Sequence, residues 1–406
     1  MEHINLDNEE FQKALQIIQF TRRSLFLTGK AGTGKSTFLR YISETTKKKH
    51  VILAPTGIAA INAGGSTLHS FFKLPFHPLL PNDTRYNVRN MRKTLRYTSE
   101  KCKLLREVEL IIIDEISMVR ADIIDFIDKV LRVYNRNMRE PFGGKQLLLV
   151  GDIYQLEPVV REEDRQLLAP FYHSQFFFDA KVFASLQLVS IELTKVYRQN
   201  NPTFINLLDH IRSSHVTTAD LEMLNRQVGA DIDTSDSSLS ITLSTRRDTV
   251  DYINSTRLAE LDGDATIFDG TIEGDFPENN LPSPLKLELK VGAQVLFVRN
   301  DKEKRWVNGT LGTVTGFSLD VEDSKDAIIY VRTEDGVEFD VEQEIWSNIK
   351  YTFNEKEQKI EESVLGTFCQ FPLRLAWAIT VHKSQGSEFQ AVVMPLLGGF
   401  PKLYYR

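Results

Sequence analysis

The residues with the clearest chemical potential form a glycine-rich loop over 29–36, with the sequence Gly-Lys-Ala-Gly-Thr-Gly-Lys-Ser. It lies between an apolar run ending at Leu27 and a helical pattern beginning at Thr37, which is the strand–loop–helix setting of phosphate-binding loops. Glycines let backbone N–H groups surround a triphosphate, and the following helix turns its positive end toward the anion. Lys35 can reach the β- and γ-phosphates, and Ser36 can ligate Mg²⁺. We therefore expect a nucleoside triphosphate to contact Gly29, Ala31, Gly32, Thr33, Gly34, Lys35, Ser36 and Thr37.

Two acids, Asp114 and Glu115, follow a strongly apolar strand pattern further along the chain. At the end of a buried parallel strand, Asp114 can hold Mg²⁺ and Glu115 can deprotonate an attacking water. Gln155 follows another apolar strand and can contact the γ-phosphate. Tyr197 can stack on a base, and Arg198 can pair with the γ-phosphate. The hydrolytic groups that the sequence predicts are therefore Lys35, Ser36, Asp114, Glu115, Gln155 and Arg198, with Ser36 and Asp114 as metal ligands.

Four further segments suit a track for single-stranded nucleic acid: 54–57, 64–72, 306–312 and 378–386. They combine hydroxyl and amide side chains, imidazoles, aromatic rings and tight turns. Such groups contact phosphates and stack on bases without reading a sequence and without a high net charge. The predicted contacts are Pro55, Thr56, Gly57, Thr67, His69, Ser70, Phe72, Asn308, Thr380, His382, Lys383 and Ser384.

The elements that must position these residues form an α/β pattern in the first half of the chain. Short apolar runs at 24–28, 51–54, 109–113 and 146–150 alternate with helical stretches, which predicts a parallel sheet covered on both faces. Residues 75–105 interrupt this pattern with prolines and a basic stretch, so we expect a surface excursion there.

The second half of the chain changes character. Helical spacing over 203–229 and a strand at 239–243 precede hairpin-rich β structure over 264–366, which we interpret as a small barrel inserted into a second α/β domain. A helix-like run over 373–379 and a final strand at 391–396 follow.

Composition sets further bounds on the 406 residues. The net charge of −6 argues against a bulk polyanion binder, but residues 1–100 hold 15 Lys/Arg against 7 Asp/Glu, hence +8. Residues 251–350 hold 10 against 21, hence −11. Two cysteines favour a reducing compartment, and no run approaches the roughly 18 apolar residues of a membrane span, so we expect no membrane partner.

The order of the motifs resembles superfamily-one helicases, specifically the PIF family with its RecD-like relatives. The matching sequences are GKAGTGKS, APTGIAA, GGSTLHSFF, IIIDEISMV, PFGGKQLLLVGDIYQLEPV, YRQ, VNGTLGTV and AWAITVHKSQGSEF. Gln12 matches the adenine-reading glutamine of the family, and Tyr197, Gln385 and Gly386 join the nucleotide contacts. Ser387 and Glu388 are closer to the RecD pattern than to the eukaryotic branch.

The resemblance implies two RecA-like P-loop domains with ATP and Mg²⁺ in the cleft between them. The first would span 1–190 with a wedge over 64–76, and the second 191–263 plus 367–406, with a β-barrel insert over 264–366. It implies 5′→3′ translocation on single-stranded DNA, unwinding of forked DNA and of G-quadruplexes, and a monomer that can dimerise on DNA. Roles in DNA repair, recombination and telomere maintenance accompany this family. It also implies a further motif beyond Arg406, so we expect the given chain to be truncated.

Two alternatives stay open at this point: an ATP-gated single-strand clamp without unwinding, and an RNA-directed helicase. No residue visibly selects against a 2′-hydroxyl. The first 20 residues contain acids and look like neither a signal nor a transit peptide. We expect a bacterial cytoplasmic protein, or a nuclear or mitochondrial one if the source is eukaryotic.

Overall fold

The computed structural model describes residues 8–75, 77–197, 201–228, 239–278, 281–303, 305–318, 327–385, 387, 389, 391–395 and 403–405. The chain groups into two compact units. Unit 1 is Met1–Ile205 with Asn348–Leu365, and unit 2 is Asn206–Ser347 with Gly366–Arg406. The predicted division into two motor domains and an inserted domain is finer than this grouping and stays a prediction.

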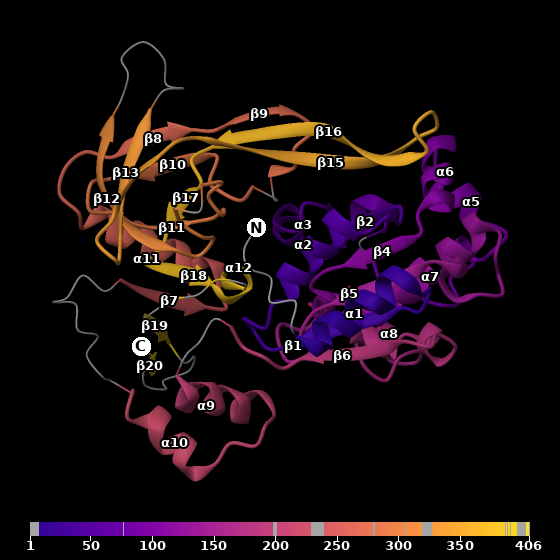
Figure 1. Ribbon diagram of the computed structural model, residues 1–406. Helices are drawn as coiled ribbons and strands as arrows, with labels where there is room; N and C mark the ends of the chain where they lie inside the picture. Colours follow the sequence, from indigo (N-terminus) through magenta and orange to yellow (C-terminus); the bar gives the residue numbers. More distant parts are fainter. Residues whose placement is uncertain are drawn as a thin grey trace. The chain divides into compact units, whose positions relative to one another are not determined.

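Unit 1 is built on a six-stranded sheet of order β3-β2-β4-β5-β1-β6, in which every pair of neighbours is parallel (Figure 1). The strands are β1 (Leu25–Gly29), β2 (His50–Ala54), β3 (Ser66–Thr67), β4 (Leu110–Ile113), β5 (Gln146–Val150) and β6 (Val189–Leu193). All four strands predicted for this half are present, which confirms the parallel sheet. Because all strands run the same way, their carboxyl ends meet at one edge, and the predicted site residues follow those ends.

Helices connect these strands. They are α1 (Glu9–Phe20), α2 (Lys35–Thr45), α3 (Gly57–Asn62), α4 (Leu68–Phe72), α5 (Met91–Leu95), α6 (Ser99–Glu107), α7 (Ala121–Asn135) and α8 (Glu162–Leu168). Short 3₁₀ turns lie at Thr84–Tyr86, Ile116–Met118, Pro141–Gly144, Phe177–Asp179 and Lys181–Ala184. Helix α2 begins at Lys35, two residues before the predicted start, directly after Gly34, whose φ of +94° suits glycine.

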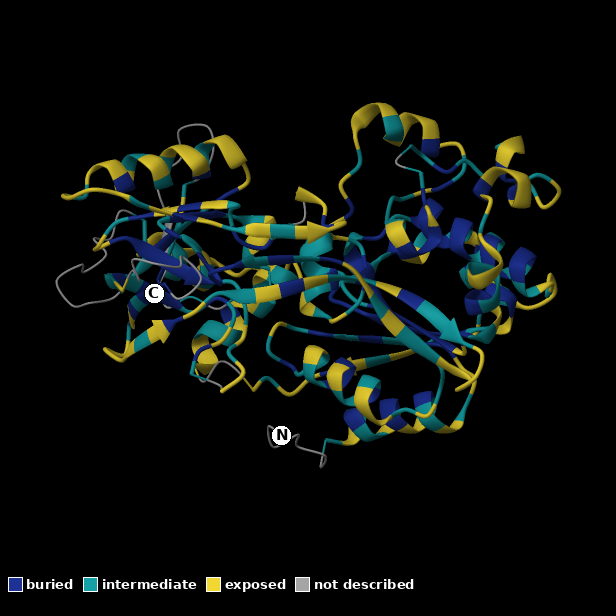
Figure 2. Ribbon diagram, turned by 90° about the horizontal axis from the view of Figure 1, so that it is seen from above, coloured by how far each residue is buried: buried dark blue, intermediate teal, exposed yellow. Residues whose placement is uncertain are grey.

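Alternating residues of the sheet face two separate cores. Leu25, Leu27 and Ile112 pack with α1 and α2 in one core. Ile111 and Ile113 pack with α4, α6 and α7 in the other. Each of these helices therefore has a buried face toward the sheet and an exposed face, so that buried and exposed residues alternate along the helices in Figure 2. A strand buried on both faces needs apolar residues at successive positions, which explains the uninterrupted run Leu110–Ile113.

Unit 2 holds a smaller α/β sheet of order β18-β7-β19-β20. Its first three strands are parallel, and β20 pairs antiparallel with β19. The elements are α10 (Thr218–Asn225), β7 (Ser240–Ser244), α11 (Arg247–Ala259), β18 (Ala378–Thr380), α12 (Val381–Ser384), β19 (Ala391–Met394) and β20 (Leu403–Tyr405), while α9 (Pro202–Arg212) crosses the boundary between the units. The amide of Asn254 fixes α11 to the sheet, donating to the Ala378 carbonyl at 2.9 Å and accepting from its N–H at 2.9 Å.

The β-rich part of unit 2 is antiparallel, as the alternating pattern predicts. A five-stranded sheet has the order β14-β13-β12-β11-β17, and two smaller sheets have the orders β10-β8 and β15-β16-β9. The strands are β8 (Thr266–Asp269), β9 (Thr271–Gly274), β10 (Lys286–Leu289), β11 (Gln294–Phe297), β12 (Leu311–Ser318), β13 (Ile328–Thr333), β14 (Glu338–Val341), β15 (Glu344–Asn354), β16 (Lys359–Gln370) and β17 (Leu373–Leu375). Its closure into a barrel stays a prediction.

One prediction of secondary structure is wrong. Residues 373–379 were expected to be helix-like, but they form β17 and the start of β18. Leu373 pairs with Phe297 and Leu375 with Val295. A short apolar run is compatible with a helix or a strand, and here the hydrogen bonds to β11 favour the strand.

The long hairpin of β15 and β16 is divided between the units, because residues 348–365 group with unit 1. Tyr351 is buried there, and its hydroxyl accepts a hydrogen bond from the Ile52 N–H at 3.4 Å. Phe353 lies under the ammonium groups of Lys49 and Lys103, 4.9 and 5.4 Å from its ring centroid. The tip of the hairpin is therefore part of the packing of unit 1.

Candidate nucleotide and nucleic-acid sites

The glycine-rich loop leaves β1 at Gly29 and enters α2 at Lys35. Gly29 has φ +149°, and a Cβ atom there would lie 2.6 Å from the Leu193 carbonyl oxygen of β6, so no other residue fits this crossing. Gly34 is the N-cap with φ +94°, and no side chain caps the helix. The first N–H groups of an eleven-residue helix are therefore left to an anion.

Lys35 folds back over the loop. Its ammonium group donates to the carbonyl oxygens of Gly29 at 2.6 Å and Lys30 at 2.9 Å, and the Thr33 hydroxyl donates to the Lys30 carbonyl at 2.9 Å. These are weaker acceptors than phosphate oxygens. The lysine is thus held at the mouth of the loop, where a β- or γ-phosphate can replace the carbonyl oxygens.

The two acids after β4 are held in different conformations. Asp114 accepts the N–H of Glu115 at 2.9 Å, while Glu115 adopts φ +50°, which turns it sharply from the strand. Burial raises the pKa of Asp114. Burial, and next the Asp114 carboxylate, raise the pKa of Glu115 to about 7, against a smaller opposing effect of Lys35. A carboxylate with this pKa can take a proton from water near neutral pH.

Asp152, which the sequence analysis did not select, joins this group. It is buried at the end of β5, its charge contributes to the raised pKa of Glu115, and it accepts the Tyr154 N–H at 3.1 Å. The Gln155 N–H donates to its carbonyl at 3.0 Å, so Asp152 forms the turn that presents Gln155. Its place directly after an apolar strand could have revealed it.

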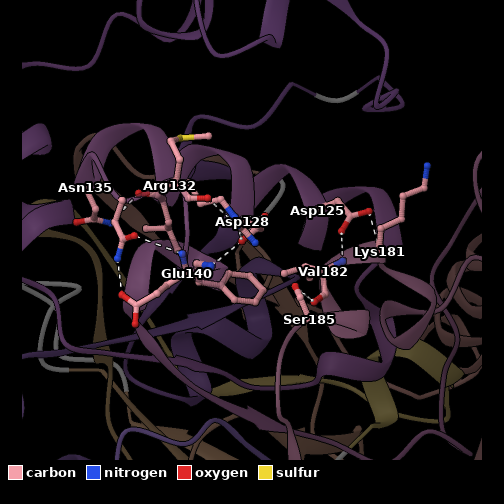
Figure 3. A network of polar contacts seen from close by, with 12 residues as sticks. Asp125, Asp128, Arg132, Asn135, Glu140, Lys181, Val182 and Ser185 are labelled. Atoms are coloured by element: carbon pink, nitrogen blue, oxygen red, sulfur yellow. Dashed lines mark hydrogen bonds and ion pairs between the residues drawn. The ribbon is translucent and has the colours of Figure 1, made fainter.

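A network on α7 fixes the segment that leads into β5 (Figure 3). Asp128 accepts the Phe142 N–H at 2.6 Å and the Arg132 guanidinium at 2.9 Å. Gly143 has φ +62°, and a Cβ atom there would lie 2.7 Å from the Leu131 carbonyl. Asp125 accepts the N–H groups of Lys181 and Val182, both at 3.0 Å. The Pro-Phe-Gly-Gly sequence is thus a structural anchor rather than a contact to ligand.

A place for the base lies beside the loop. The Tyr197 N–H donates to the Gly32 carbonyl at 2.9 Å, and its hydroxyl accepts from the Asn8 side chain at 3.5 Å. Gln12 lies one turn after Asn8 on α1. The structure therefore brings Tyr197 and α1 to the loop, as the base-stacking prediction requires. Arg198 and Gly386 lie outside the described residues, and Gln385 is in a turn of unit 2.

The metal prediction agrees with the chemistry of the donors. No group of three or more His, Cys, Asp or Glu side chains in the described ranges is arranged to hold a metal ion. Mg²⁺ needs only one or two protein oxygens when phosphates and water supply the rest. The Ser36 hydroxyl and the Asp114 carboxylate are hard oxygen ligands of this kind.

Two predicted nucleic-acid segments meet in unit 1, because Leu53 pairs with Ser66 and Ala54 with Thr67. The segment Pro55–Gly57 and the start of α4 therefore lie at the same edge. The Thr56 hydroxyl caps α3 by accepting the Ala59 N–H at 3.2 Å, and the Thr67 hydroxyl caps α4 by accepting the Ser70 N–H at 3.1 Å.

The residues predicted on helix α4 to contact nucleic acid are not equally accessible. Ser70 is exposed and His69 half-buried, but Phe72 has no exposed surface and lies in the core, with its ring centroid 4.9 Å from that of Phe71. Phe72 as a stacking contact is therefore wrong, because on a five-residue helix the apolar face must pack on the sheet. Burial, and then the charge of Arg120, lower the pKa of His69, so its imidazole is neutral at pH 7.

The other predicted nucleic-acid residues come together in unit 2. Gly309 has φ +100°, and a Cβ atom there would lie 2.7 Å from the Ser387 Cβ, so the turn that carries Asn308 lies against the segment after α12. Thr380 caps α12 by accepting the Lys383 N–H at 3.4 Å. Burial, and then the charges of Arg374 and Arg247, lower the pKa of Lys383 to about 8. His382 is exposed and Ser384 half-buried on the same turn.

Comparison with known proteins matches two family profiles to the chain: "PIF1-like helicase" over residues 5–222, and "DNA helicase Pif1, 2B domain" over residues 277–317. The ATP-dependent DNA helicase PIF1 of Rattus norvegicus is 34% identical over 401 residues, which are 95% of this chain and 57% of the relative. The chain thus spans little more than half the length of that relative.

Solved structures match more completely. Pif1 from Bacteroides sp in complex with ADP-AlF4 is 42% identical with a TM-score of 0.86, covering 95% of this chain and 85% of that one. Bacteroides Pif1 bound to ssDNA is 41% identical with a TM-score of 0.62, covering 97% and 87%. The two RecA-like domains implied by the motifs agree with this likeness. None of the helices among the described residues is long and apolar enough to cross a membrane.

Proposed function

Because this chain belongs to the PIF1-like helicase family, we propose that it is an ATP-dependent DNA helicase that moves 5′→3′ along single-stranded DNA and separates duplexes. The observation that carries the proposal is the phosphate-binding loop with Lys35 at its mouth, together with a half-buried carboxylate, Glu115, whose pKa is raised to about 7. A general base works best when its pKa is close to the operating pH.

The hydrolytic step follows from these positions. Lys35 exchanges its carbonyl partners for the β- and γ-phosphates of ATP, and the open N–H groups of α2 bind the same phosphates. Glu115 accepts a proton from the attacking water, and Gln155 contacts the γ-phosphate. Mg²⁺, held by Ser36 and Asp114, would neutralise charge on the phosphates. Arg198, which lies outside the described residues, is included in the proposed set because of the motif order alone.

DNA is the proposed partner, as a single strand and as a fork. The support is the exposed and half-buried polar groups of Ser70, His69 and His382, which suit sequence-tolerant contacts, and the likeness to Bacteroides Pif1 bound to ssDNA. We extend the proposal to G-quadruplex DNA, to a monomer that can dimerise on DNA, and to a bacterial cytoplasmic setting, which the likeness to Bacteroides proteins favours.

A fork-unwinding assay tests the function. A duplex with a 5′ single-stranded tail should be separated with ATP and Mg²⁺ but not with a non-hydrolysable analogue, and a 3′-tailed duplex should stay intact. Lys35→Ala serves as the inactive control. ATP-dependent binding of the tail without strand separation would identify a clamp instead. Equal unwinding of an RNA-tailed fork would identify a helicase without DNA preference.

A further inference from the structure

Four cations of unit 1 lie on a surface that the proposed mechanism does not use: Lys73, Arg92, Lys101 and Lys350, which we call the basic strip. Three of them rest on aromatic rings. The Lys101 ammonium is 3.2 Å from the Phe71 ring centroid, the Lys73 ammonium 6.0 Å from that of Tyr97, and the Arg92 guanidinium 5.7 Å from that of Tyr134.

The rings join these cations into one surface. The centroids of Tyr97 and Tyr134 are 4.7 Å apart, so Lys73 and Arg92 lie over neighbouring members of one pair. Arg92 also donates to the Val133 carbonyl at 3.0 Å, which fixes it to α7. Lys350 and Lys73 are the charges that act on Lys101, after burial, to lower its pKa to about 7.

Among the described residues, the lysines of the strip have no carboxylate partner, in contrast to their neighbours. In the part of the chain that the structure describes, no carboxylate lies within ion-pair distance of Lys73, Lys101 or Lys350, whereas nearby Lys49 pairs with Glu107 at 2.8 Å and Lys103 pairs with Glu355. Gathering like charges raises the free energy of the folded chain. A bound polyanion would relieve this repulsion.

The strip suits a duplex better than a single strand. Its rings cannot stack on bases, since Phe71 and Tyr134 are buried and the Tyr97 hydroxyl bonds to the Phe72 carbonyl. Single-strand sites combine cations with accessible aromatic faces, whereas the bases of a duplex are stacked on one another and its backbone presents phosphates and sugars to a cationic surface. The bond from Tyr97 to Phe72 also joins the strip to the end of α4, the helix that carries His69 and Ser70.

We propose that the basic strip binds the phosphate backbone of the duplex arm of a fork, while the single strand occupies the α4 edge. The inference rests on the proposed function, because it assigns the duplex part of the same substrate. Phosphates of one strand recur every few ångströms along the arm, so several cations of the strip can each contact one.

The test compares two DNAs on three triple variants of the 406-residue chain. The strip variant is Lys73→Gln, Arg92→Gln and Lys101→Gln. A charge-keeping variant carries Lys73→Arg, Arg92→Lys and Lys101→Arg. The matched control, Arg22→Gln, Arg23→Gln and Arg40→Gln, removes the same charge from exposed positions of unit 1. Fluorescence anisotropy without nucleotide measures binding to a 5′-tailed fork and to the tail strand alone over a range of salt.

The strip variant should bind the fork about 10-fold more weakly while its affinity for the tail changes less than about 2-fold. Its slope of log K against log salt for the fork should fall by about 0.9 for each lost phosphate contact. The charge-keeping and control variants should bind both DNAs like the unchanged chain. Circular dichroism melting checks the fold, and Lys73→Gln with Lys101→Gln, which keeps the Arg92 bond to α7, should retain most of the effect.

Two results would overturn the inference. Equal losses for fork and tail would assign the strip to the single-strand track, and no loss for either would make it a solvated surface. Failure of the unchanged chain to bind either DNA would instead reject the proposed function, and the inference with it.

Discussion

The phosphate loop over 29–36 and helix α4 both follow a strand of the same parallel sheet, yet they offer a ligand different groups. The loop offers backbone N–H groups and one lysine, and its glycines are needed for backbone geometry, since Gly29 lies against the Leu193 carbonyl and Gly34 has φ +94°. Helix α4 begins directly after β3 and offers side chains, of which Leu68, Phe71 and Phe72 are taken by the core.

This difference predicts how substitutions at each site affect ligand binding and stability. A binding loop made from backbone depends on a few residues of special chemistry, and its other side chains can change without loss of the anion site. A site on a five-residue helix shares each turn with the core, so a substitution there can remove stability, contact or both. Three substitutions separate these effects, in order of expected size.

The largest effect, on ATP turnover, is expected from a change of Glu115, the proposed general base beside the loop. Glu115→Gln removes the proton acceptor while keeping the shape of the side chain, so DNA-stimulated ATP turnover should fall about 10²–10⁴-fold. ATP affinity should stay nearly unchanged, because no phosphate contact is lost. Steady-state hydrolysis and equilibrium binding of a fluorescent ATP analogue measure the two quantities.

Lys35→Ala is the companion variant, and it should lose affinity as well as turnover because Lys35 is the proposed phosphate contact. Glu115→Gln with more than about a tenth of normal turnover would mean that Glu115 is not the base. Matched losses of affinity in both variants would mean that Glu115 shapes the loop rather than acting on water.

The next effect is expected in the core face of α4. Phe72→Ala should lower the free energy of unfolding by about 3–5 kcal/mol, because a fully buried ring is replaced by a cavity. Thermal unfolding of unit 1 measures this, and Phe20→Ala is the matched control because Phe20 is 80% exposed. Single-strand affinity of the folded Phe72 variant should stay within about 2-fold. Normal stability with lost affinity would restore Phe72 to the DNA track.

The same contrast decides what could be predicted from sequence. The parallel sheet and the strand–loop–helix setting of residues 29–36 are specified by local patterns, an apolar run and glycines at fixed spacing, and the structure confirms both. The role of Phe72 depends on which face of α4 meets the sheet, and that is a tertiary property. Asn8 became visible only through its neighbour Tyr197, whereas the position of Asp152 after an apolar strand was a signal that its contribution to the pKa of Glu115 made clear. Strand β17 is specified by its pairing with β11, and β18 by its pairing with β7, both distant in sequence.

The smallest effect is expected at His69 on the other face of α4. Burial lowers the pKa of this imidazole, so it is neutral at pH 7 and can contact DNA by a hydrogen bond but not by charge. His69→Ala should therefore weaken single-strand binding by about 0.5–1.5 kcal/mol, the net contribution of one hydrogen bond. The salt slope should stay unchanged, because no counter-ion is released when a neutral group binds phosphate. Anisotropy with a single strand over a range of salt measures both, with the exposed His173→Ala as the matched control. A reduced salt slope would show that His69 is charged in the complex, and an unchanged affinity would leave Ser70 as the α4 residue that meets DNA.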